Sequence, residues 1–588
     1  MSQRRALVLV RARPLAAFGL LAGLLVFALY LGALSHPFQY DDRHSIQYNP
    51  HLRSLDKIPA YFTDLHTFSS DSRGTMFRPL VLLSYALNYA AGGQGVVGYR
   101  LVNLGLHLVC AVLLFAWLYR RGPPAGAWAA GLIFAAHPTH AEPVIYLSSR
   151  SDLMVSCWYL GGLLWAARSR WSAAAGAYAG GLLSKEVAIT LPLLVGLQQG
   201  WVRTRAAWRP LLLMGLVGLG YLALISLNTF LPGSLAKAPR GWGVQALTQV
   251  KAYVYYLWLF IMPAHLSVEH QFFVSSGLDA AVAAAALLLG SVCWLAWRSR
   301  GQLPALGWAW FALALAPASM VPLNILVSER RMYLASAGLC LILAWCWPRL
   351  GRARWAGPAL LALLAALSLG RNPVWASEVG LWEDAVANGP GMFRARANLG
   401  LAYKHAGRDE EALRQMRLAL EINPDYADAW VELGNLLNDQ GEVRDAAEAY
   451  HRALRLNPSQ EGAHYNLGNL AQAGGQWQAA ADYYLAALRL HPGFAEARNN
   501  LGQVYEALGR PELGLEQYRW SLSLNPELAP AWYNLAAYLE RQGQGAEAAA
   551  AYRRCRQLLL ADPEYQTNPQ YQNFARRSLE AAARLEGN

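Results

Sequence analysis

The sequence predicts an all-α protein in which a polytopic helical membrane domain precedes a helical-repeat solenoid. The 588 residues are 55% hydrophobic and 15% charged, whereas about 25% of a typical soluble protein is charged. Apolar stretches fill the chain up to about Gly370, and beyond Glu378 it becomes charged, Ala-rich and periodic. We therefore expect four regions: a membrane domain over 1–376, a linker over 377–392, a solenoid over 393–562 and a capping helix over 563–588.

The first apolar run, over 15–34, is long enough for a transmembrane helix and too long for a typical cleaved signal sequence. The remaining candidate spans are 99–119, 126–147, 152–167, 171–184, 186–200, 210–230, 279–298, 304–324, 332–347 and 356–370. Several are shorter than the roughly 20 residues that cross a bilayer. Two long connections, 35–98 and 231–278, contain apolar segments that we expect to lie along the outer surface.

Arginine clusters occupy alternate connections between these spans. With a cytoplasmic N-terminus every cluster falls inside, as the positive-inside rule requires: Arg120 and Arg121, Arg168 and Arg170, Arg203, Arg205 and Arg209, Arg298 and Arg300, and Arg349, Arg352 and Arg354. Eleven crossings then place the C-terminal domain outside. The net charge of +12 thus reflects the arginines of the cytoplasmic connections, and nucleic acid is not expected as a partner.

The C-terminal part repeats with a period of 34 residues. Pro424, Pro458, Pro492 and Pro526 recur at this interval, as do Leu-Gly pairs and an aromatic position. This period with these residue types is the tetratricopeptide (TPR) signature, in which small residues let two helices touch and the proline follows the second helix. We expect about five repeats.

Amide side chains recur on the first helix of these repeats: Asn398, Asn435, Asn466, Asn469, Asn500 and Asn534. Residues three apart share a helix face. One interpretation is ordinary repeat composition. The other is an amide ladder on the concave face that hydrogen-bonds an acceptor peptide.

Ionisable residues gather at the outer ends of the spans. They are Asp41 and Asp42, His137, His140 and Glu142, Arg150 and Asp152, Lys185 and Glu186, and Glu329, Arg330 and Arg331. Each charge in a span costs roughly 2.5–3.5 kcal/mol, so by default such residues are functional. Under the predicted topology all five groups reach one leaflet, which predicts a polar cavity at the outer membrane surface.

Each group also has a plainer interpretation. Adjacent carboxylates are often a solvated turn, and a His-x-x-His pair serves as readily in helix-end hydrogen bonding as in metal ligation. The charged pairs can be ion pairs that lower the cost of insertion. Helix-end capping alone does not explain five such groups on one side.

The combination suits one kind of chemistry. Cations in a membrane-facing cavity suit a lipid phosphate, and a carboxylate suits a general base that deprotonates a hydroxyl. Together they describe glycosyl transfer from a polyprenyl phosphate, with inversion if no covalent intermediate forms.

Several segments carry a resemblance that runs the full length of the chain. They are FQYDDRHSIQYNP (38–50), FRPLVLLSYALN (77–88), GYRLVNLGLHLV (98–109), HPTHAEPV and SRSDLM (137–154), LLSKEVAIT (182–190), SERRMYLAS (328–336) and the repeat tail. In these the chain resembles the transmembrane-and-TPR O-mannosyltransferases (the TMTC proteins) of the GT-C superfamily.

The resemblance implies an inverting transferase that moves mannose from a polyprenyl-phosphate donor to Ser or Thr of exported proteins. Asp41 looks like its general base and Asp42 like the support of that base. The implied donor-phosphate residues are Arg330, Arg331, Glu329, Lys185, Glu186 and Arg150. His137, His140, Glu142, Asp152 and Arg78 would shape the site.

Members of this superfamily differ in metal use, so no metal ligand is assigned, and a divalent cation is left open as a cofactor. The Ala-, Arg- and Trp-rich composition looks bacterial, which predicts an inner-membrane protein with a periplasmic solenoid and an undecaprenyl-type donor. Two alternatives remain: a related transferase or ligase that acts on glycan or lipid acceptors, and a non-catalytic scaffold whose repeats recruit periplasmic partners.

Overall fold

The computed structural model describes residues 2–70, 76–200, 208–228, 230, 240–561 and 569–586, which form helices, turns and loops without a β-strand. This confirms the all-α prediction. The chain divides into two compact units, Met1–Ala395 and Arg396–Asn588, which are described separately below.

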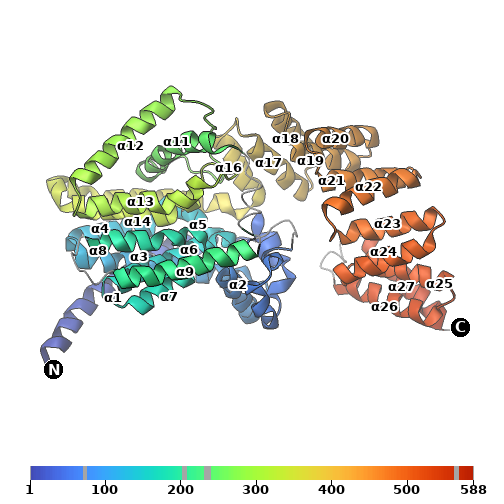
Figure 1. Ribbon diagram of the computed structural model, residues 1–588, viewed down its shortest axis with the longest axis horizontal. Helices are drawn as coiled ribbons and strands as arrows, with labels where there is room; N and C mark the ends of the chain where they lie inside the picture. Colours follow the sequence, from blue (N-terminus) through green and yellow to red (C-terminus); the bar gives the residue numbers. More distant parts are fainter. Residues whose placement is uncertain are drawn as a thin grey trace. The chain divides into compact units, whose positions relative to one another are not determined.

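The first unit is built from helices that include several of membrane-spanning length (Figure 1). Its helices are α1 (Ser2–Tyr30), α2 (Pro79–Gly92), α3 (Val96–Arg121), α4 (Pro124–Ala136), α5 (Ala141–Ile145), α6 (Arg150–Ala166), α7 (Trp171–Leu182), α8 (Leu191–Gly200), α9 (Trp208–Leu227), α11 (Trp242–Ile261), α12 (Ala280–Arg298), α13 (Leu303–Met320), α14 (Met332–Cys346), α15 (Gly357–Arg371) and α16 (Glu378–Asn388).

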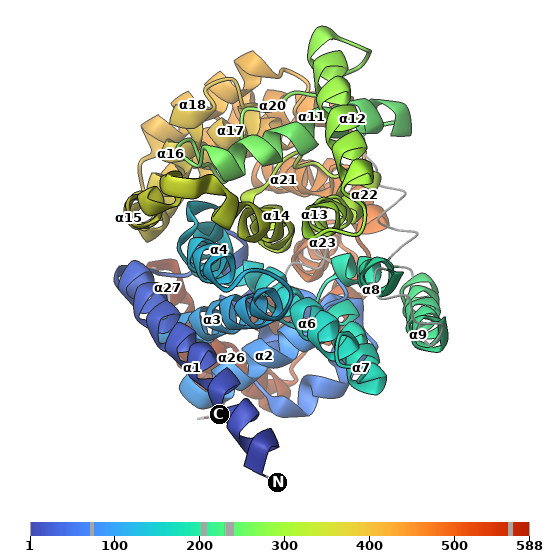
Figure 2. The same cartoon turned by 90° about the vertical axis from the view of Figure 1, so that its left-hand side faces the viewer.

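The core of this unit is a helix bundle, seen nearly end-on in Figure 2. Helix α3 packs against α1, α4 and α6, and α14 packs against α4 and α13. Small residues permit the closest approach: a Cβ on Gly307 would lie 2.5 Å from the carbonyl oxygen of Gly338, and the reverse also holds. Tight packing through small residues is how membrane helices associate without help from the hydrophobic effect.

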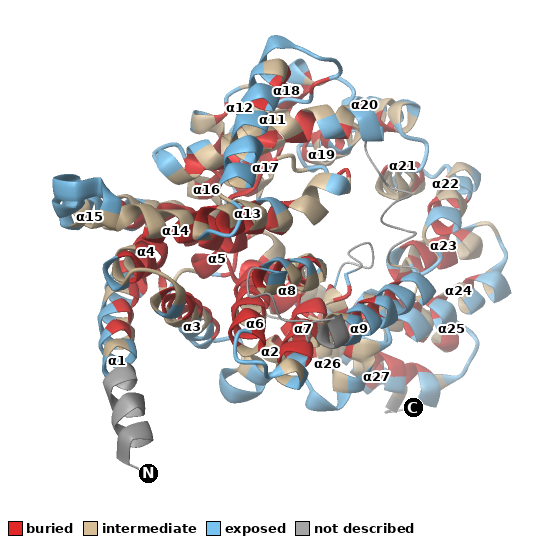
Figure 3. Cartoon of the chain, turned by 60° about the vertical axis from the view of Figure 1, so that its left-hand side comes forward, coloured by how far each residue is buried: buried red, intermediate tan, exposed pale blue. Residues whose placement is uncertain are grey.

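Other helices of the unit keep apolar side chains on the surface. Along α12, Leu287 is 75% exposed and Trp294 57%, and α9 and α12 are coloured largely as exposed or intermediate in Figure 3. Such surface fits contact with lipid. By length and composition five helices of the described residues can cross a membrane, and two shorter ones are also apolar. The number of eleven crossings stays a prediction, and Arg203 and Arg205 lie outside the described residues.

Two segments differ from their expected form. The predicted span over 126–147 contains a helix that stops at Ala136, because the chain turns at His137-Pro138 before the short α5. The expected linker contains helix α16, capped by the Ser377 hydroxyl, which accepts a hydrogen bond from Gly380 N. Trp382 of α16 is buried, so this helix is part of the first unit.

Paired helices make up the second unit and the segment that leads into it. Helix α17 (Phe393–His405) leads into α18 (Asp409–Ile422), and the pairs that follow are α19 (Ala427–Asp439) with α20 (Val443–Leu456), α21 (Glu461–Ala473) with α22 (Trp477–Leu490), α23 (Ala495–Ala507) with α24 (Pro511–Leu524), α25 (Ala529–Arg541) with α26 (Gly545–Ala561), and finally α27 (Pro569–Glu586).

The repeated residues explain the paired geometry. A Cβ at Gly468 would lie 2.6 Å from the ring of Tyr484, so glycine at this position lets α22 place its tyrosine close against α21. Gly475, between these helices, has φ +71°, a conformation that glycine adopts without strain. After each of the first four pairs the proline carbonyl lies within hydrogen-bond distance of the side chain six positions on, as for Trp430 Nε1, which donates to the Pro424 carbonyl at 2.8 Å.

Candidate functional site

Asp41 and Asp42 lie in the chain that leaves α1, directly after Tyr40. The φ of Tyr40 is 48°, which is uncommon for a residue other than glycine. Such a conformation costs on the order of 1–3 kcal/mol and persists only where surrounding contacts hold it. The Tyr40 ring packs edge-on against Trp382 with centroids 5.3 Å apart, and this packing helps to fix the turn that carries both carboxylates.

The Asp42 carboxylate is buried and occupied by protein donors. Its Oδ1 accepts hydrogen bonds from Ser148 N at 2.7 Å and from Ser148 Oγ at 2.6 Å, and Gln39 N donates to Oδ2 at 3.4 Å. Burial raises the pKa of Asp42 to about 6, and these hydrogen bonds oppose the rise only in part. Asp42 therefore ties the turn to the segment before α6.

The Asp41 carboxylate is more open, with 37% of its side chain exposed. His44 Nε2 lies 3.4 Å from Asp41 Oδ1, and Asp41 N donates a hydrogen bond to the Tyr146 hydroxyl at 3.2 Å. Burial acts to raise the pKa of Asp41, but the His44 hydrogen bond, the charge of Arg330 and the Tyr146 hydrogen bond together bring it below its usual value. Asp41 is therefore an ionised, accessible carboxylate.

Arg330 lies in the turn before α14, and its charge acts on Asp41. Its backbone N donates to Glu142 Oε2 at 3.1 Å, and its Nε lies 4.0 Å from Glu142 Oε1. The side chain is 28% exposed, and its guanidinium donates no hydrogen bond to any residue that the structure describes. Its charge also interacts with those of Asp152 and Asp41. These unused donors suit a phosphate oxygen.

Two further cation–carboxylate pairs adjoin this centre. Lys185 Nζ donates to Asp152 Oδ1 at 2.6 Å. Arg78 lies 3.4 Å from Glu186 Oε2 and donates to Ser151 Oγ at 3.2 Å. Lys185 interacts electrostatically with Arg78, Glu186 and Arg330. The structure thus brings seven of the sequence candidates into one network: Asp41, Arg78, Glu142, Asp152, Lys185, Glu186 and Arg330.

Arg150 lies apart from this network in a buried site of its own. Its Nε donates to Asn103 Oδ1 at 2.8 Å and its guanidinium also donates to Asn88 Oδ1 and to the Tyr99 carbonyl. The guanidinium carbon lies 4.6 Å from the centroid of the Tyr85 ring. With its donors engaged and no exposed surface, Arg150 joins helices to one another.

Four other candidates hold the backbone around the site. Arg331 donates to the carbonyls of Leu326 and Ile325, both at 2.9 Å, and the Glu329 carboxylate accepts from Ser267 N. Each imidazole of the His-x-x-His pair is hydrogen-bonded through both ring nitrogens. His137 contacts Thr139 Oγ1 (2.7 Å) and the Phe260 carbonyl (3.0 Å), and His140 contacts the Phe134 carbonyl (2.8 Å) and Ser336 Oγ (2.9 Å).

Three hydrogen-bond partners of the acidic pair were not predicted from the sequence. Ser148 binds Asp42, and Tyr146 and His44 bind Asp41. The only signal was proximity, because His44 follows the acidic pair and the other two precede Arg150 in the chain. Among the described residues no three His, Cys, Asp or Glu side chains are grouped as metal ligands.

In the second unit the asparagines join successive repeats. Asn435 Oδ1 accepts from Asn466 Nδ2 (2.7 Å) and from the Tyr450 hydroxyl (2.9 Å). The same pattern recurs one repeat later, where Asn469 Oδ1 accepts from Asn500 Nδ2 at 3.0 Å. Asn534 Nδ2 continues the series to Asn499, whereas Asn398 has no hydrogen bond to a described residue.

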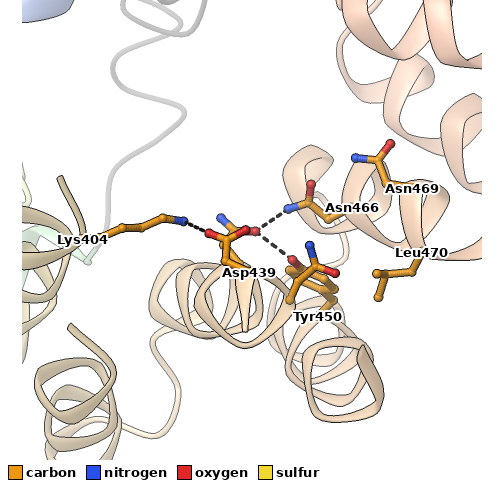
Figure 4. Close-up of a pocket in the computed structure, with 8 residues that line it drawn as sticks. Lys404, Asp439, Tyr450, Asn466, Asn469 and Leu470 are labelled. Atoms are coloured by element: carbon orange, nitrogen blue, oxygen red, sulfur yellow. Dashed lines mark hydrogen bonds and ion pairs between the residues drawn. The ribbon is translucent and has the colours of Figure 1, made fainter. Parts of the chain in front are cut away.

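A polar cavity of about 240 Å³ opens on this series of amides, as Figure 4 shows. Its lining residues are Lys404, Asn435, Asn438, Asp439, Tyr450, Asn466, Asn469 and Leu470. Lys404 and Asp439 form an ion pair at 2.8 Å across it. The side-chain carbonyl oxygen of Asn469 accepts hydrogen bonds from Asn500 Nδ2 at 3.0 Å and from the Tyr484 hydroxyl at 2.7 Å.

The chain is similar to several proteins named O-mannosyl-transferases. The chain is 28% identical over 538 residues to "Protein O-mannosyl-transferase Tmtc1" of Drosophila melanogaster, covering 70% of this chain and 62% of that protein. It is 24% identical to "Protein O-mannosyl-transferase F38B6.6" of Caenorhabditis elegans, covering 68% and 61%. A shorter match of 37% identity to mouse "Protein O-mannosyl-transferase TMTC2" covers 25% and 18%. The chain thus spans about three fifths of the first two relatives.

The tetratricopeptide repeat model matches residues 379–427, 412–461, 431–495, 465–526 and 499–558. Among solved structures, MamA is 25% identical with a TM-score of 0.25, covering 27% of this chain and 94% of that one. Pseudomonas aeruginosa PilF is 24% identical with a TM-score of 0.28, covering 33% and 92%. The resemblance drawn from the sequence is confirmed: the chain is a homologue of the TMTC protein O-mannosyl-transferases and carries tetratricopeptide repeats in its C-terminal part.

Proposed function

We propose that this protein is an inverting glycosyltransferase of the GT-C type that moves a sugar, mannose, from a polyprenyl-phosphate donor to Ser or Thr hydroxyls of exported proteins. The observation that carries the proposal is the pairing of an accessible carboxylate, Asp41, with a guanidinium, Arg330, that has unused donors. Relatives named O-mannosyl-transferases support the same chemistry.

The proposed reaction is a single displacement. The acceptor oxygen attacks the anomeric carbon while the bond from that carbon to the phosphate oxygen breaks, so the configuration inverts. The acceptor proton passes to Asp41. The leaving polyprenyl phosphate takes the electron pair of the broken bond, and Arg330 stabilises its developing charge. No covalent enzyme intermediate forms.

Electrostatic interaction couples the role of Asp41 as base to the role of Arg330 in binding the phosphate. Arg330 is one of the groups that lower the pKa of Asp41, which makes Asp41 a weaker base before the donor binds. A donor phosphate at Arg330 would offset that positive charge, so the basicity of Asp41 would rise when the donor is in place. Asp42 acts at a distance, since it fixes the turn through Ser148.

The amide series and polar cavity of the C-terminal unit form the proposed acceptor site. Asn469 and its counterparts would bind the backbone of an extended peptide without reading its sequence, as amide groups can donate to and accept from any peptide unit. We place the protein in a bacterial inner membrane with its solenoid in the periplasm. The arginine distribution supports this orientation.

The test is transfer from a mannosyl phospho-polyprenol to a Ser/Thr-containing acceptor protein by the purified full chain. Asp41→Asn should lower kcat about 100-fold or more, as loss of a general base typically does, while the full chain still inserts and folds. The matched control is Asp56→Asn, which alters an exposed carboxylate of the same outer segment and should transfer normally. Unchanged transfer by Asp41→Asn would remove Asp41 from the role of base.

A further inference from the structure

Asp152 has a buried carboxylate oxygen that the fold leaves without a partner. The residue lies in the first turn of α6 and is 6% exposed. Its Oδ1 is bound by Lys185 Nζ at 2.6 Å, but its Oδ2 has no hydrogen-bond partner among the described residues. A buried oxygen of a charged group costs free energy when it accepts no hydrogen bond. Such an atom calls for an explanation.

Lys185 supplies matching donors beside this oxygen. Its ammonium carries three N–H donors, and within the described part of the chain it bonds only to Asp152 Oδ1. The Lys185 side chain is 13% exposed. An acceptor and at least one donor are therefore held next to each other in a shielded place, already fixed by their own ion pair.

The position of this pair relates it to the proposed reaction centre. Arg330 interacts electrostatically with Asp152 as well as with Asp41 and Glu142, so Asp152 and Asp41 both adjoin the guanidinium proposed for the donor phosphate. The donor phosphate carries two groups, the polyprenyl chain and the sugar, and of these only the sugar has hydroxyls that can hydrogen-bond to Asp152. Another phosphate is a poor occupant, because the carboxylate would repel it.

We infer that Asp152 and Lys185 bind hydroxyl groups of the transferred sugar, with Asp152 Oδ2 accepting from one hydroxyl and Lys185 Nζ donating to it or to its neighbour. The inference rests on the proposed function and assigns the residues that select the sugar. A hydroxyl both donates and accepts, so it fits this pair as no apolar group does. The acceptor Ser or Thr has a single hydroxyl, which Asp41 engages.

The experiment removes single hydroxyls from the sugar of the donor and, separately, the carboxylate of Asp152 from the protein. Mannosyl phospho-polyprenol and its 2-, 3-, 4- and 6-deoxy analogues are compared as donors for the wild type and for Asp152→Asn. In the wild type one deletion should lower kcat/KM about 10- to 100-fold, the range for hydrogen bonds to charged groups. In Asp152→Asn that same deletion should have little further effect, while the other analogues keep their wild-type ratios.

Lys185→Gln is the second variant and should lose selectivity at the same hydroxyl or the adjacent one. Asp56→Asn is the matched control and should keep the full wild-type pattern. An equal loss on every donor in both variants would show a purely structural role and overturn the inference, as would a change confined to the KM of the acceptor. If the wild type transfers from none of these donors, the proposed function itself fails.

Discussion

At the scale of single residues, the acidic pair gives a pH-dependent prediction. Burial raises the pKa of Asp42 to about 6, above the value of about 4 in an unfolded chain. Between these values the folded state binds more protons than the unfolded state, so the contribution of Asp42 to stability falls as pH rises from about 4 to about 6. Across that window the free energy of unfolding of the wild type should therefore fall by on the order of 2 kcal/mol relative to that of Asp42→Asn.

Thermal unfolding of the full chain in detergent at pH 4 and pH 6.5 measures this difference, with Asp56→Asn again as the control. The opposite sign, in which the wild type gains on the variant as pH rises, would mean that Asp42 is a stabilising charge. Asp41 has the opposite pH dependence. Its pKa lies below the usual value, so its ionised form stabilises the folded state, and this contribution is lost only in acid.

The sequence could predict that charged groups from distant segments come together, but not which of two neighbours keeps its side-chain donors unused. Arg330 and Arg331 are adjacent, yet one keeps free donors and the other binds two carbonyls. They lie in the 3₁₀ turn Glu329–Arg331, where each step along the chain rotates the side chain by about 120°. Asp41 and Asp42 diverge for a similar reason. The unpartnered oxygen of Asp152 depends on contacts that no motif encodes.

At the scale of elements, the repeat pattern predicts the cost of a single methyl group. Gly468→Ala would place a Cβ 2.6 Å from the Tyr484 ring and force α21 and α22 apart, whereas Gly462 in the same helix has only Val431 nearby, at 3.9 Å. Overpacking of this kind costs about 1–3 kcal/mol. Hydrogen exchange of the full chain should show faster opening of α21 and α22 in Gly468→Ala.

Gly462→Ala is the matched control, and should leave exchange unchanged or slower because alanine favours helix. Equal exchange in the two variants would mean that the contact with Tyr484 yields at no cost. The repeat helices could be predicted from the sequence because their residue types recur with a strong period. Helix α16 could not be, since it joins the two regions and its burial depends on contacts such as that of Trp382 with Tyr40.

At the scale of the whole molecule, the predicted topology divides charge between the two ends of the membrane domain. Up to residue 376 the acidic residues all fall in the connections predicted to be outside or at the outer ends of the predicted spans: Asp41, Asp42, Asp56, Asp64, Asp71, Glu142, Asp152, Glu186, Glu269, Asp279 and Glu329. The connections predicted to be inside contain arginines and no carboxylate. This separation is stronger than the positive-inside rule requires, since acidic residues contribute little to orientation.

The division predicts which cysteines a membrane-impermeant maleimide will reach in intact cells. Asp56→Cys and Asp445→Cys should be labelled from outside, and Arg300→Cys only after the membrane is permeabilised, each against a background in which the exposed Cys293 is replaced by Ser. The acceptor and the lipid donor can react only if the carboxylate site and the repeats face one compartment. Labelling of position 56 without position 445 would place the repeats in the cytoplasm, and the proposed transfer to exported proteins would then have no acceptor site.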